Sequence, residues 1–222
     1  MRKLKHFTLK KQIYLRKKKF SADEKAELQK RKFCYIYAFR HGLTNYNDRD
    51  IFTGCLDSVL GKQGFRDAEK IARQIKNRKF EVAYVSHLRR SKQTLKPSLK
   101  YHPELREIIE DDRIIERCYG DLEGHSKNKF ARENPVLFPK IHRGYSTAPP
   151  HGESFAMVEK RVMSFMKDLI KKMKKEKVNV AISCHGNSLR PIRKYFEGLS
   201  RTEMSTLENP WDKAFVYKVK VR

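Results

Sequence analysis

Two apolar runs, Phe33-Cys-Tyr-Ile-Tyr-Ala-Phe39 and Val178-Asn-Val-Ala-Ile-Ser-Cys184, decide the fold, because each ends directly in a polar cluster. Arg40-His41-Gly42 follows the first run and His185-Gly186-Asn187 follows the second. Short apolar runs of this length are typical of buried strands. In an open α/β sheet, ligands bind beyond the carboxyl ends of the strands, so two distant strand ends can supply one site. Histidines beside an arginine at such a place predict phosphoryl chemistry.

Predicted strands alternate with predicted helices along the rest of the chain, which favours a parallel sheet. The expected elements are a strand at 33–39, helices at 62–77 and 89–99 around a strand at 82–86, a helix ending near 175, a strand at 178–184, a helix that contains 189–196 and a strand at 214–220. Helix 62–77 is predicted to bury a stripe formed by Phe65, Ala68, Ile71, Ala72 and Ile75. We therefore predict an α/β domain with three layers, a mostly parallel central sheet and helices on both faces.

The length of 222 residues and the hydrophobic content of 39% are consistent with one domain that has a substantial core. Residues 33–222 are predicted to form the catalytic domain, and residues 1–32 a basic N-terminal extension. Within the extension, Ser21-Ala-Asp-Glu24 matches a capping box and predicts a polar helix at 22–32. Residues 111–152 are rich in Gly, Pro and charge, so we expect an insertion over the site.

The formal net charge is +25, and residues 1–32 hold thirteen Lys/Arg against three Asp/Glu. We interpret most of this charge as solvated lysines, and expect weak, non-specific polyanion contact through the basic N-terminus. The chain shows neither an apolar run of bilayer length nor a secretory signal, so we expect a cytoplasmic protein without membrane contact. Four cysteines without a CxxC pair predict reduced thiols. The sequence leaves homo-oligomer formation open.

Several segments together resemble a known family. They are Tyr37-Ala-Phe-Arg-His-Gly42, Phe52-Thr-Gly54, Glu116-Arg-Cys-Tyr-Gly-Asp-Leu-Glu-Gly124, Gly152-Glu-Ser154 and Cys184-His-Gly-Asn-Ser-Leu-Arg190. In order and spacing they resemble the cofactor-dependent phosphoglycerate mutases of the histidine phosphatase superfamily. The resemblance covers roughly residues 35–217. It implies interconversion of 3-phosphoglycerate and 2-phosphoglycerate in glycolysis, primed by 2,3-bisphosphoglycerate.

His41 is the predicted nucleophile, since a histidine that attacks phosphorus must be neutral and held in one tautomer. Neighbouring arginines should lower its pKa by charge repulsion. Arg40, Arg90 and His185 are expected to donate to the transferring phosphoryl group, with Asn47 as a neutral donor. Arg90 is chosen over Arg89 from the resemblance of Ser86-His-Leu-Arg-Arg-Ser-Lys-Gln-Thr94 to the family's segment. The resemblance also implies that Glu116 is the acid/base group; Glu123 and Glu153 are weaker candidates.

A second group of residues is predicted to hold the rest of a small, highly charged substrate. By resemblance, this substrate clamp consists of Thr53, Gly54, Arg117, Tyr119, Lys127, Arg143 and Asn187. Gly42 and Gly186 are expected to let the backbone approach the anion closely. A metal site is disfavoured, because both histidines already have roles and the sequence contains neither HExxH nor a Cys/His cluster.

The sequence also departs from the family's usual pattern. Leu43 stands where glutamate is common, Cys118 where histidine is common, and His142-Arg143 where two arginines are common. The chain ends at Arg222, soon after the last predicted strand, whereas many relatives carry a longer tail that covers the site; without a lid, water would compete for the phosphohistidine. Two alternatives therefore stay open: a histidine phosphatase acting on phosphomonoesters, and a basic interaction protein built on a retired enzyme fold.

Overall fold

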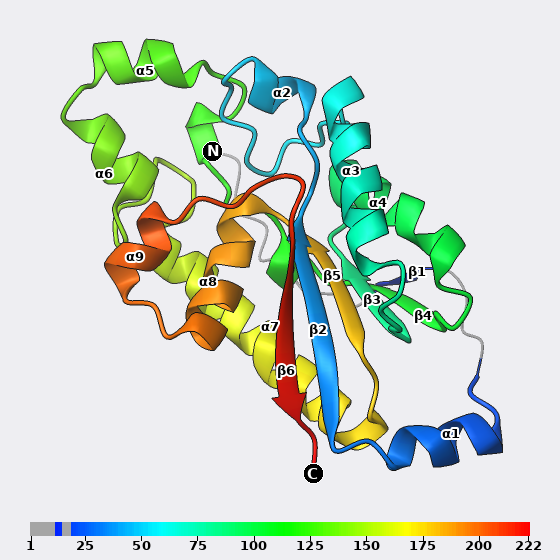
Figure 1. Ribbon diagram of the computed structural model, residues 1–222. Coiled ribbons are helices and arrows are strands. Elements are labelled where there is room, and N and C mark those ends of the chain that lie inside the picture. Colours follow the sequence, from blue (N-terminus) through cyan, green and yellow to red (C-terminus); the bar gives the residue numbers. More distant parts are fainter. Residues whose placement is uncertain (1–11, 15–18) are drawn as a thin grey trace.

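The computed structural model describes residues 12–14 and 19–222 and has an α/β fold built on one six-stranded sheet (Figure 1). The strands are β1 (Gln12–Tyr14), β2 (Phe33–Arg40), β3 (Val82–Val85), β4 (Glu107–Glu110), β5 (Val180–Cys184) and β6 (Ala214–Lys220). Their order in the sheet is β1-β4-β3-β5-β2-β6. The four inner strands run parallel, and β1 and β6 are antiparallel edges. The predicted α/β fold with a mostly parallel sheet is confirmed.

Helices connect these strands. They are α1 (Ala22–Gln29), α2 (Asn45–Asp48), α3 (Lys62–Ile75), α4 (Arg89–Leu95), α5 (Lys127–Glu133), α6 (Leu137–Arg143), α7 (Phe155–Glu176), α8 (Gly186–Glu197) and α9 (Arg201–Thr206), with short 3-10 helices η1 (Lys96–Tyr101), η2 (Asp112–Ile114) and η3 (Gly120–Leu122). The capping box at Ser21 and Glu24 forms as predicted. Helices α2, α5 and α6 lie at the end of the sheet where β2 and β5 finish (Figure 1).

Two hydrophobic cores explain the three layers. In β2, Ile36 and Ala38 point into the core that contains α7 and α8, whereas Tyr37 and Phe39 point into the core that contains α3. Successive strand residues face opposite sides of a sheet, so an unbroken apolar run is what a strand covered on both faces requires. The predicted helices on both faces of the sheet are thus present.

Several details differ from the sequence prediction, among them β1, which was not predicted, and α1, which ends at Gln29 and not at residue 32. Phe65 is 47% exposed, because the first turn of α3 packs through Gly64 against Gly42 and Leu43, the residues that follow β2. The helix predicted at 89–99 ends at Leu95 and continues as η1, whose first turn holds Pro97, a residue that cannot continue an α-helical hydrogen-bond ladder. Strand β4 was not predicted, since its two isoleucines lie between glutamates.

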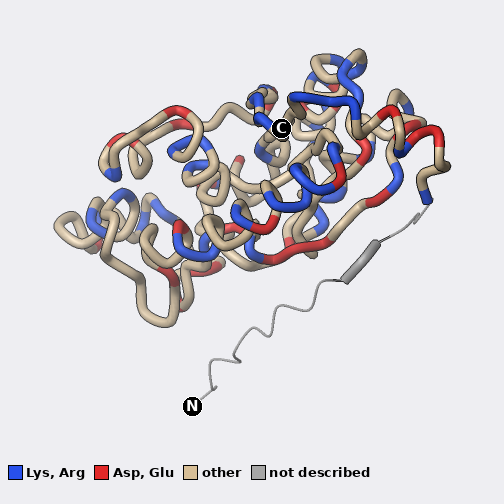
Figure 2. Tube along the Cα trace, turned by 90° about the horizontal axis from the view of Figure 1, so that it is seen from below, with Lys and Arg blue, Asp and Glu red and all other residues tan. Residues whose placement is uncertain are grey.

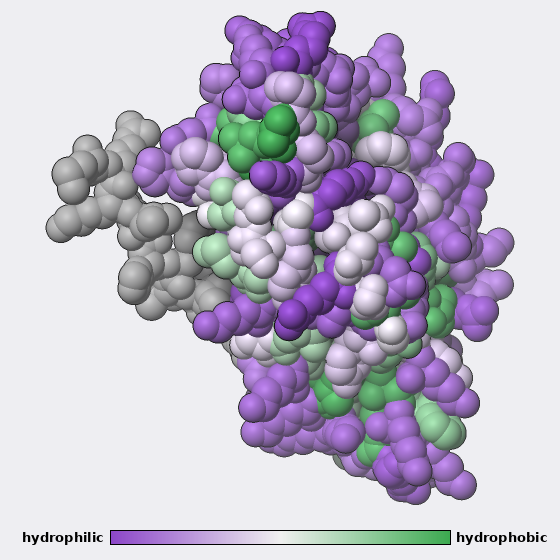
Figure 3. Space-filling model, turned by 90° about the vertical axis from the view of Figure 1, so that its left-hand side faces the viewer, coloured by the Kyte–Doolittle hydropathy of each residue, from purple (hydrophilic) through white to green (hydrophobic). Residues whose placement is uncertain are grey.

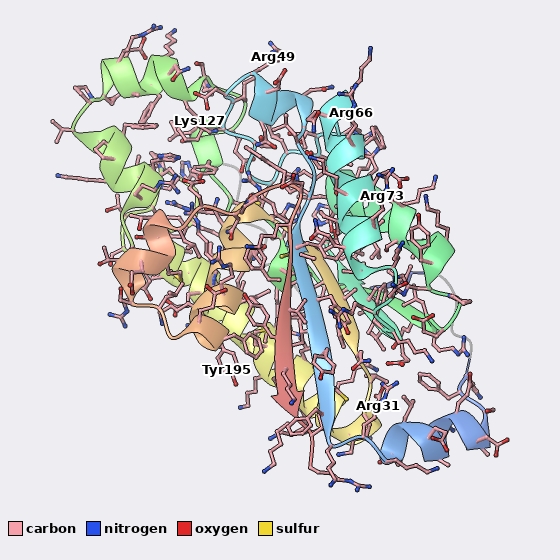
Figure 4. All side chains as sticks on the ribbon, viewed as in Figure 1. Arg31, Arg49, Arg66, Arg73, Lys127 and Tyr195 are labelled. Carbon is pink, nitrogen blue, oxygen red and sulfur yellow. A yellow bond between two sulfur atoms is a disulfide. The ribbon has the colours of Figure 1, made fainter. Side chains whose placement is uncertain are left out.

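Residues of the predicted N-terminal extension contact the rest of the chain at several places. Strand β1 pairs with β4, and Leu28 of α1 is buried in the core beside α7. At the end of α1, the Arg31 guanidinium donates to both Glu81 carboxylate oxygens at 2.9 and 3.0 Å and to the Lys177 carbonyl at 3.1 Å (Figure 4). Glu81 is buried, so this pair ties the extension to the start of β3.

Positive charge is spread over the surface. Lys and Arg occur along most of the chain drawn in Figure 2, and hydrophilic residues cover most of the face in Figure 3. Among the described residues, no helix has the length and apolar character needed to cross a bilayer. The charge therefore forms a broad positive field that attracts anions.

We expect a chain that starts at residue 33 to keep kcat but to unfold at a lower temperature. Its loss of Arg31 would leave Glu81 buried without its cation, and hydrogen bonds to charged groups contribute about 1.5–3 kcal/mol each. Thermal melts and steady-state kinetics of the two chains check this.

In the full chain, Arg31→Met should reproduce much of the stability loss. The matched control is Lys30→Met, because Lys30 and its partner Glu27 are both 70% exposed and such a pair contributes little. A truncated chain that folds but loses its catalytic rate would contradict the prediction.

Candidate active site

The site begins where β2, β5 and β3 end side by side. Arg40 pairs with Cys184 in the sheet register, and the His41 amide donates to the Cys184 carbonyl at 2.9 Å. Ser86 follows β3, and its hydroxyl lies 2.8 Å from Nε2 of His185. The His41 and His185 rings are 5.1 Å apart. Two histidines separated by more than 140 residues are therefore neighbours because their strands are neighbours.

His41 is held as a neutral nucleophile. It is 2% exposed, and its Nδ1 lies 2.8 Å from the Gly42 carbonyl, which can only accept, so Nδ1 carries the proton and Nε2 keeps its lone pair. Burial, followed by the charges of Arg90 and Arg40, holds the pKa of His41 well below its usual value. The predicted lowering by arginines is present, but burial is the larger cause.

Arg40 and Arg90 supply buried positive charge beside this ring. Arg90 donates to the Gly54 and Leu56 carbonyls at 2.7 and 2.6 Å, and Arg40 donates to the Asn209 carbonyl at 3.1 Å. In both guanidinium groups the Nε is buried and finds no acceptor among the described residues. Burial lowers the pKa of Arg90 to about 10, so it remains charged at neutral pH. Buried N–H donors without partners are suited to an anion.

Close packing fixes these arginines in place. A Cβ at Gly186 would lie 3.1 Å from Nε of Arg40, so the glycine gives the guanidinium its room. At Gly42 the close neighbour is a different one: a Cβ there would lie 2.2 Å from the Gly64 carbonyl oxygen. This glycine lets α3 approach the end of β2, and the expectation that Gly42 brings backbone close to the anion stays a prediction.

Glu116 is oriented by the backbone. Its Oε1 accepts from the amides of Arg117 and Asn187 at 2.8 and 3.0 Å, and the carboxylate is 7% exposed. Ligand atoms of Glu116, His41 and His185 all lie within 4.8 Å of one another. Such a trio could hold a metal ion, but Arg40 and Arg90 beside it repel a cation and attract an anion.

A cavity of about 230 Å³ opens over these groups. Its lining contains all but two of the predicted site residues: Arg40, His41, Asn47, Thr53, Gly54, Arg90, Glu116, Tyr119, Lys127, Arg143, Gly186 and Asn187. His185 lies beneath the lining, fully buried against Ser86. Arg117 is also fully buried; it donates to the Glu153 and Thr147 carbonyls and stacks 4.5 Å from Phe155. Arg117 therefore lies behind the cavity wall.

Two of the predicted clamp cations are paired with carboxylates at the cavity. Lys127, at the start of α5 (Figure 4), lies 3.1 Å from Asp50, and Arg143 pairs with Glu208. The weaker acid/base candidates brace the backbone instead. Glu123 accepts from the amides of Cys55 and Tyr119, and Glu153 accepts from the Cys118 amide and pairs with Arg161.

Sequence reasoning missed several lining residues: Asp50, Ile51, His142, Arg190, Glu208, Asn209 and Trp211. Arg190 lies one helical turn after Gly186, a spacing that places both on one face of α8. Trp211, the single tryptophan, stacks 4.2 Å from the Arg40 guanidinium. The sequence contained a usable signal for Arg190, because a charged residue one turn into a helix lies on the same face as the first residue of that helix. It contained no comparable signal for the lining residues of the loop at 208–211.

Cys55 and Cys118 form a disulfide, with 5.1 Å between their Cα atoms. The expectation of reduced thiols is therefore wrong for this pair, while Cys34 and Cys184 are free and buried. Spacing gave no sign of the bond, because the two residues are 63 positions apart. They meet because the loops that carry Gly54 and Glu116 fold onto one cavity.

Comparison with known proteins identifies the family. The histidine phosphatase superfamily (branch 1) model matches residues 36–222. The chain belongs to the histidine phosphatase superfamily. Among curated superfamily relatives, the 2,3-bisphosphoglycerate-dependent phosphoglycerate mutase of Chlamydia abortus is 30% identical, over 83% of this chain and 93% of the relative. The phosphoglycerate mutase of Schizosaccharomyces pombe is 34% identical, over 72% and 78%.

Solved structures share the fold. A mycobacterial glucosyl-3-phosphoglycerate phosphatase superposes with a TM-score of 0.72 at 21% identity, covering 84% of this chain and 89% of that one. A putative alpha-ribazole-5'-P phosphatase from Escherichia coli has a TM-score of 0.73 at 18% identity, covering 83% and 90%. The fold of this chain is therefore shared by two proteins that are named as different phosphatases.

We expect Arg90→Gln to weaken the binding of inorganic phosphate by roughly 30- to 1000-fold. Removing one partner of a buried, charge-assisted contact costs about 2–4 kcal/mol. Isothermal titration calorimetry at fixed salt measures the change, with a thermal melt to show that the variant is folded.

Arg89→Gln is the matched control. Arg89 lies next in the chain but is exposed and paired with Asp57 at 2.9 Å, so its loss should change phosphate affinity about twofold at most. Equal effects of the two substitutions would show that phosphate binds elsewhere.

Proposed function

We propose that this histidine phosphatase superfamily member interconverts 3-phosphoglycerate and 2-phosphoglycerate through a phosphohistidine at His41, primed by 2,3-bisphosphoglycerate. The observation that carries the proposal is one cavity with positive charge in two places. Arg40 and Arg90 lie beside His41, and Lys127, Arg143 and Arg190 also line the cavity. A monophosphate needs only the first group of cations, whereas a mutase must also grip a second acidic group.

The residues account for each proton and charge in the transfer. Nε2 of His41 attacks phosphorus while Arg40, Arg90 and His185 stabilise charge on the phosphoryl oxygens. Glu116 donates a proton to the leaving oxygen and removes one when the hydroxyl attacks in return. The bisphosphate then returns its other phosphate to His41, which regenerates the primed enzyme.

The names of two curated relatives support the proposed mutase activity. The Chlamydia abortus and Schizosaccharomyces pombe proteins are both named phosphoglycerate mutases, and the first names 2,3-bisphosphoglycerate as its requirement. These matches cover 83% and 72% of this chain.

A second candidate is hydrolysis of phosphomonoesters. The specific observation in its favour is that Lys127 and Arg143 are already paired with Asp50 and Glu208, which reduces the net charge of their end of the cavity. The names of the solved neighbours, which include phosphatases, agree with this candidate. Both activities would share His41 and Glu116.

His41 should become covalently labelled when the protein is incubated with ³²P-labelled 2,3-bisphosphoglycerate. The adduct should be acid-labile and base-stable, because a phosphoramidate bond to imidazole has that behaviour. His41→Ala should take up no label, and His151→Ala, a change at a 73% exposed histidine, should be labelled like the wild type. Label that persists in His41→Ala would assign the nucleophile to another residue.

Lys127→Ala and Arg143→Ala should separate the two candidate activities. Each removes a contact to the part of the substrate remote from His41, at a cost of about 2–4 kcal/mol, or roughly 30- to 1000-fold. We expect mutase kcat/KM to fall at least about tenfold more than hydrolysis of p-nitrophenyl phosphate, which has no second acidic group.

Both reactions are to be measured in one buffer, since salt screens charge effects. Lys129→Ala is the control, because Lys129 is 69% exposed on the same helix as Lys127. If both activities fall equally, or the wild type shows no primer-dependent mutase activity, the phosphatase candidate replaces the mutase.

A further inference from the structure

His142 is a cavity residue that the proposed chemistry leaves without a role. It lies on α6, lines the cavity, and its ring stacks on Phe138 with centroids 4.9 Å apart. Neither ring nitrogen forms a hydrogen bond or ion pair with any described residue. An imidazole with both nitrogens available at a cavity wall is free to bind a ligand.

The groups that face His142 are mostly cations. Arg143 comes from the same helix, Lys127 from α5 and Arg190 from α8, and all three line the cavity with His142. Arg117 lies behind the cavity wall and acts on His142 only through its charge. The carboxylates in this part of the cavity, Asp50 and Glu208, are the partners of Lys127 and Arg143. Arg190 has no carboxylate partner among the described residues; its Nη1 donates to the Ser205 carbonyl at 2.9 Å and its buried Nε has no acceptor.

This surrounding keeps His142 neutral in the empty cavity. Burial, followed by the charges of Arg143, Lys127, Arg190 and Arg117, lowers its pKa to about 4. An arginine at this position would instead stay charged at every working pH. The histidine thus makes the charge of this end of the cavity variable.

We propose that His142 is a proton-coupled binding residue for the second anionic group of the substrate, neutral in the empty cavity and protonated once that group is bound. An anion held by Lys127, Arg143 and Arg190 cancels the repulsion that kept His142 neutral. The imidazolium then donates to the anion, and up to one proton is taken from solvent for each ligand bound, depending on the pH. This inference rests on the proposed function only in assuming a substrate with two anionic groups.

The direction of the pH effect follows from linkage. Because the complex binds one more proton than the free protein, affinity rises as pH falls, by at most about tenfold per pH unit. The rise occurs below the pKa that His142 has in the complex and above its value of about 4 in the free protein. Above the pKa that His142 has in the complex, the protonation of His142 no longer changes the affinity for the ligand.

The test uses ethane-1,2-disulfonate, which carries two permanent negative charges, so the ligand itself does not titrate. Full-length protein labelled with ¹³C-histidine is titrated by NMR between pH 5 and 8.5, with and without the disulfonate. The His142 resonance is the one that disappears in His142→Gln. We expect it to stay neutral in the free protein and to titrate between about pH 6 and 8 in the complex. Methanesulfonate, with one charge, should leave it neutral.

Two variants separate charge from shape. His142→Arg should bind the disulfonate with nearly the same affinity at pH 6 and pH 8, once the pH dependence that all variants share is subtracted. His142→Gln should bind the disulfonate weakly at both pH values. His41 and His185 also face the site, so the resonance-specific titration is what assigns the proton. His125→Gln, at an exposed histidine, should behave as the wild type.

A His142 that stays neutral in the complex, or a His142→Arg variant that keeps the wild-type pH dependence, overturns the inference. So does a disulfonate that fails to bind. If protonation accompanies binding but phosphoglycerate is not converted, the proposed function falls and the proton-coupled subsite stands. If phosphoglycerate is converted while His142 stays neutral, the reverse holds.

Discussion

The hydrogen bond from the His41 amide to the Cys184 carbonyl is the contact on which the site depends. It continues the parallel ladder of β2 and β5 by one residue and brings two imidazole rings to 5.1 Å from each other. Because β5 and the second half of β2 are buried on both faces, a slip in register would expose apolar side chains, and the core therefore fixes the histidines. The catalytic geometry is thus a by-product of strand packing.

Burying several cations at this strand end removes them from water, which costs free energy. Backbone carbonyl oxygens offset this cost by accepting hydrogen bonds from the guanidinium groups. Arg90 binds the Gly54 and Leu56 carbonyls, Arg40 binds that of Asn209, and Arg190 that of Ser205. Carbonyl dipoles satisfy a guanidinium without neutralising it, so the charge stays available to a ligand. A carboxylate partner in these places would have cancelled it. Lys127 and Arg143, whose side chains are more exposed, do have such partners.

The sequence predicted the fold and most cavity residues because both follow from local patterns. Apolar runs locate β2 and β5, and His41 and His185 follow them directly. Residues whose position depends on tertiary contacts were harder to foresee. Phe65 fits the helical period but lies beside Gly64, which makes the actual contact. Arg117 has the chemistry of a substrate ligand, yet Glu153, Thr147 and Phe155 enclose it.

The loops that carry Gly54 and Glu116 are joined at three points. Cys55 and Cys118 are bonded, Glu123 accepts from both the Cys55 and Tyr119 amides, and Phe52 exchanges backbone hydrogen bonds with Gly124 and His125. These links restrain the distance between the loop that carries Gly54 and the loop that carries Glu116. The start of α5 is fastened to the same unit, because the Lys127 amide donates to the Asp50 carbonyl at 3.0 Å, so one wall of the cavity and the proposed acid are held in a single cross-linked frame.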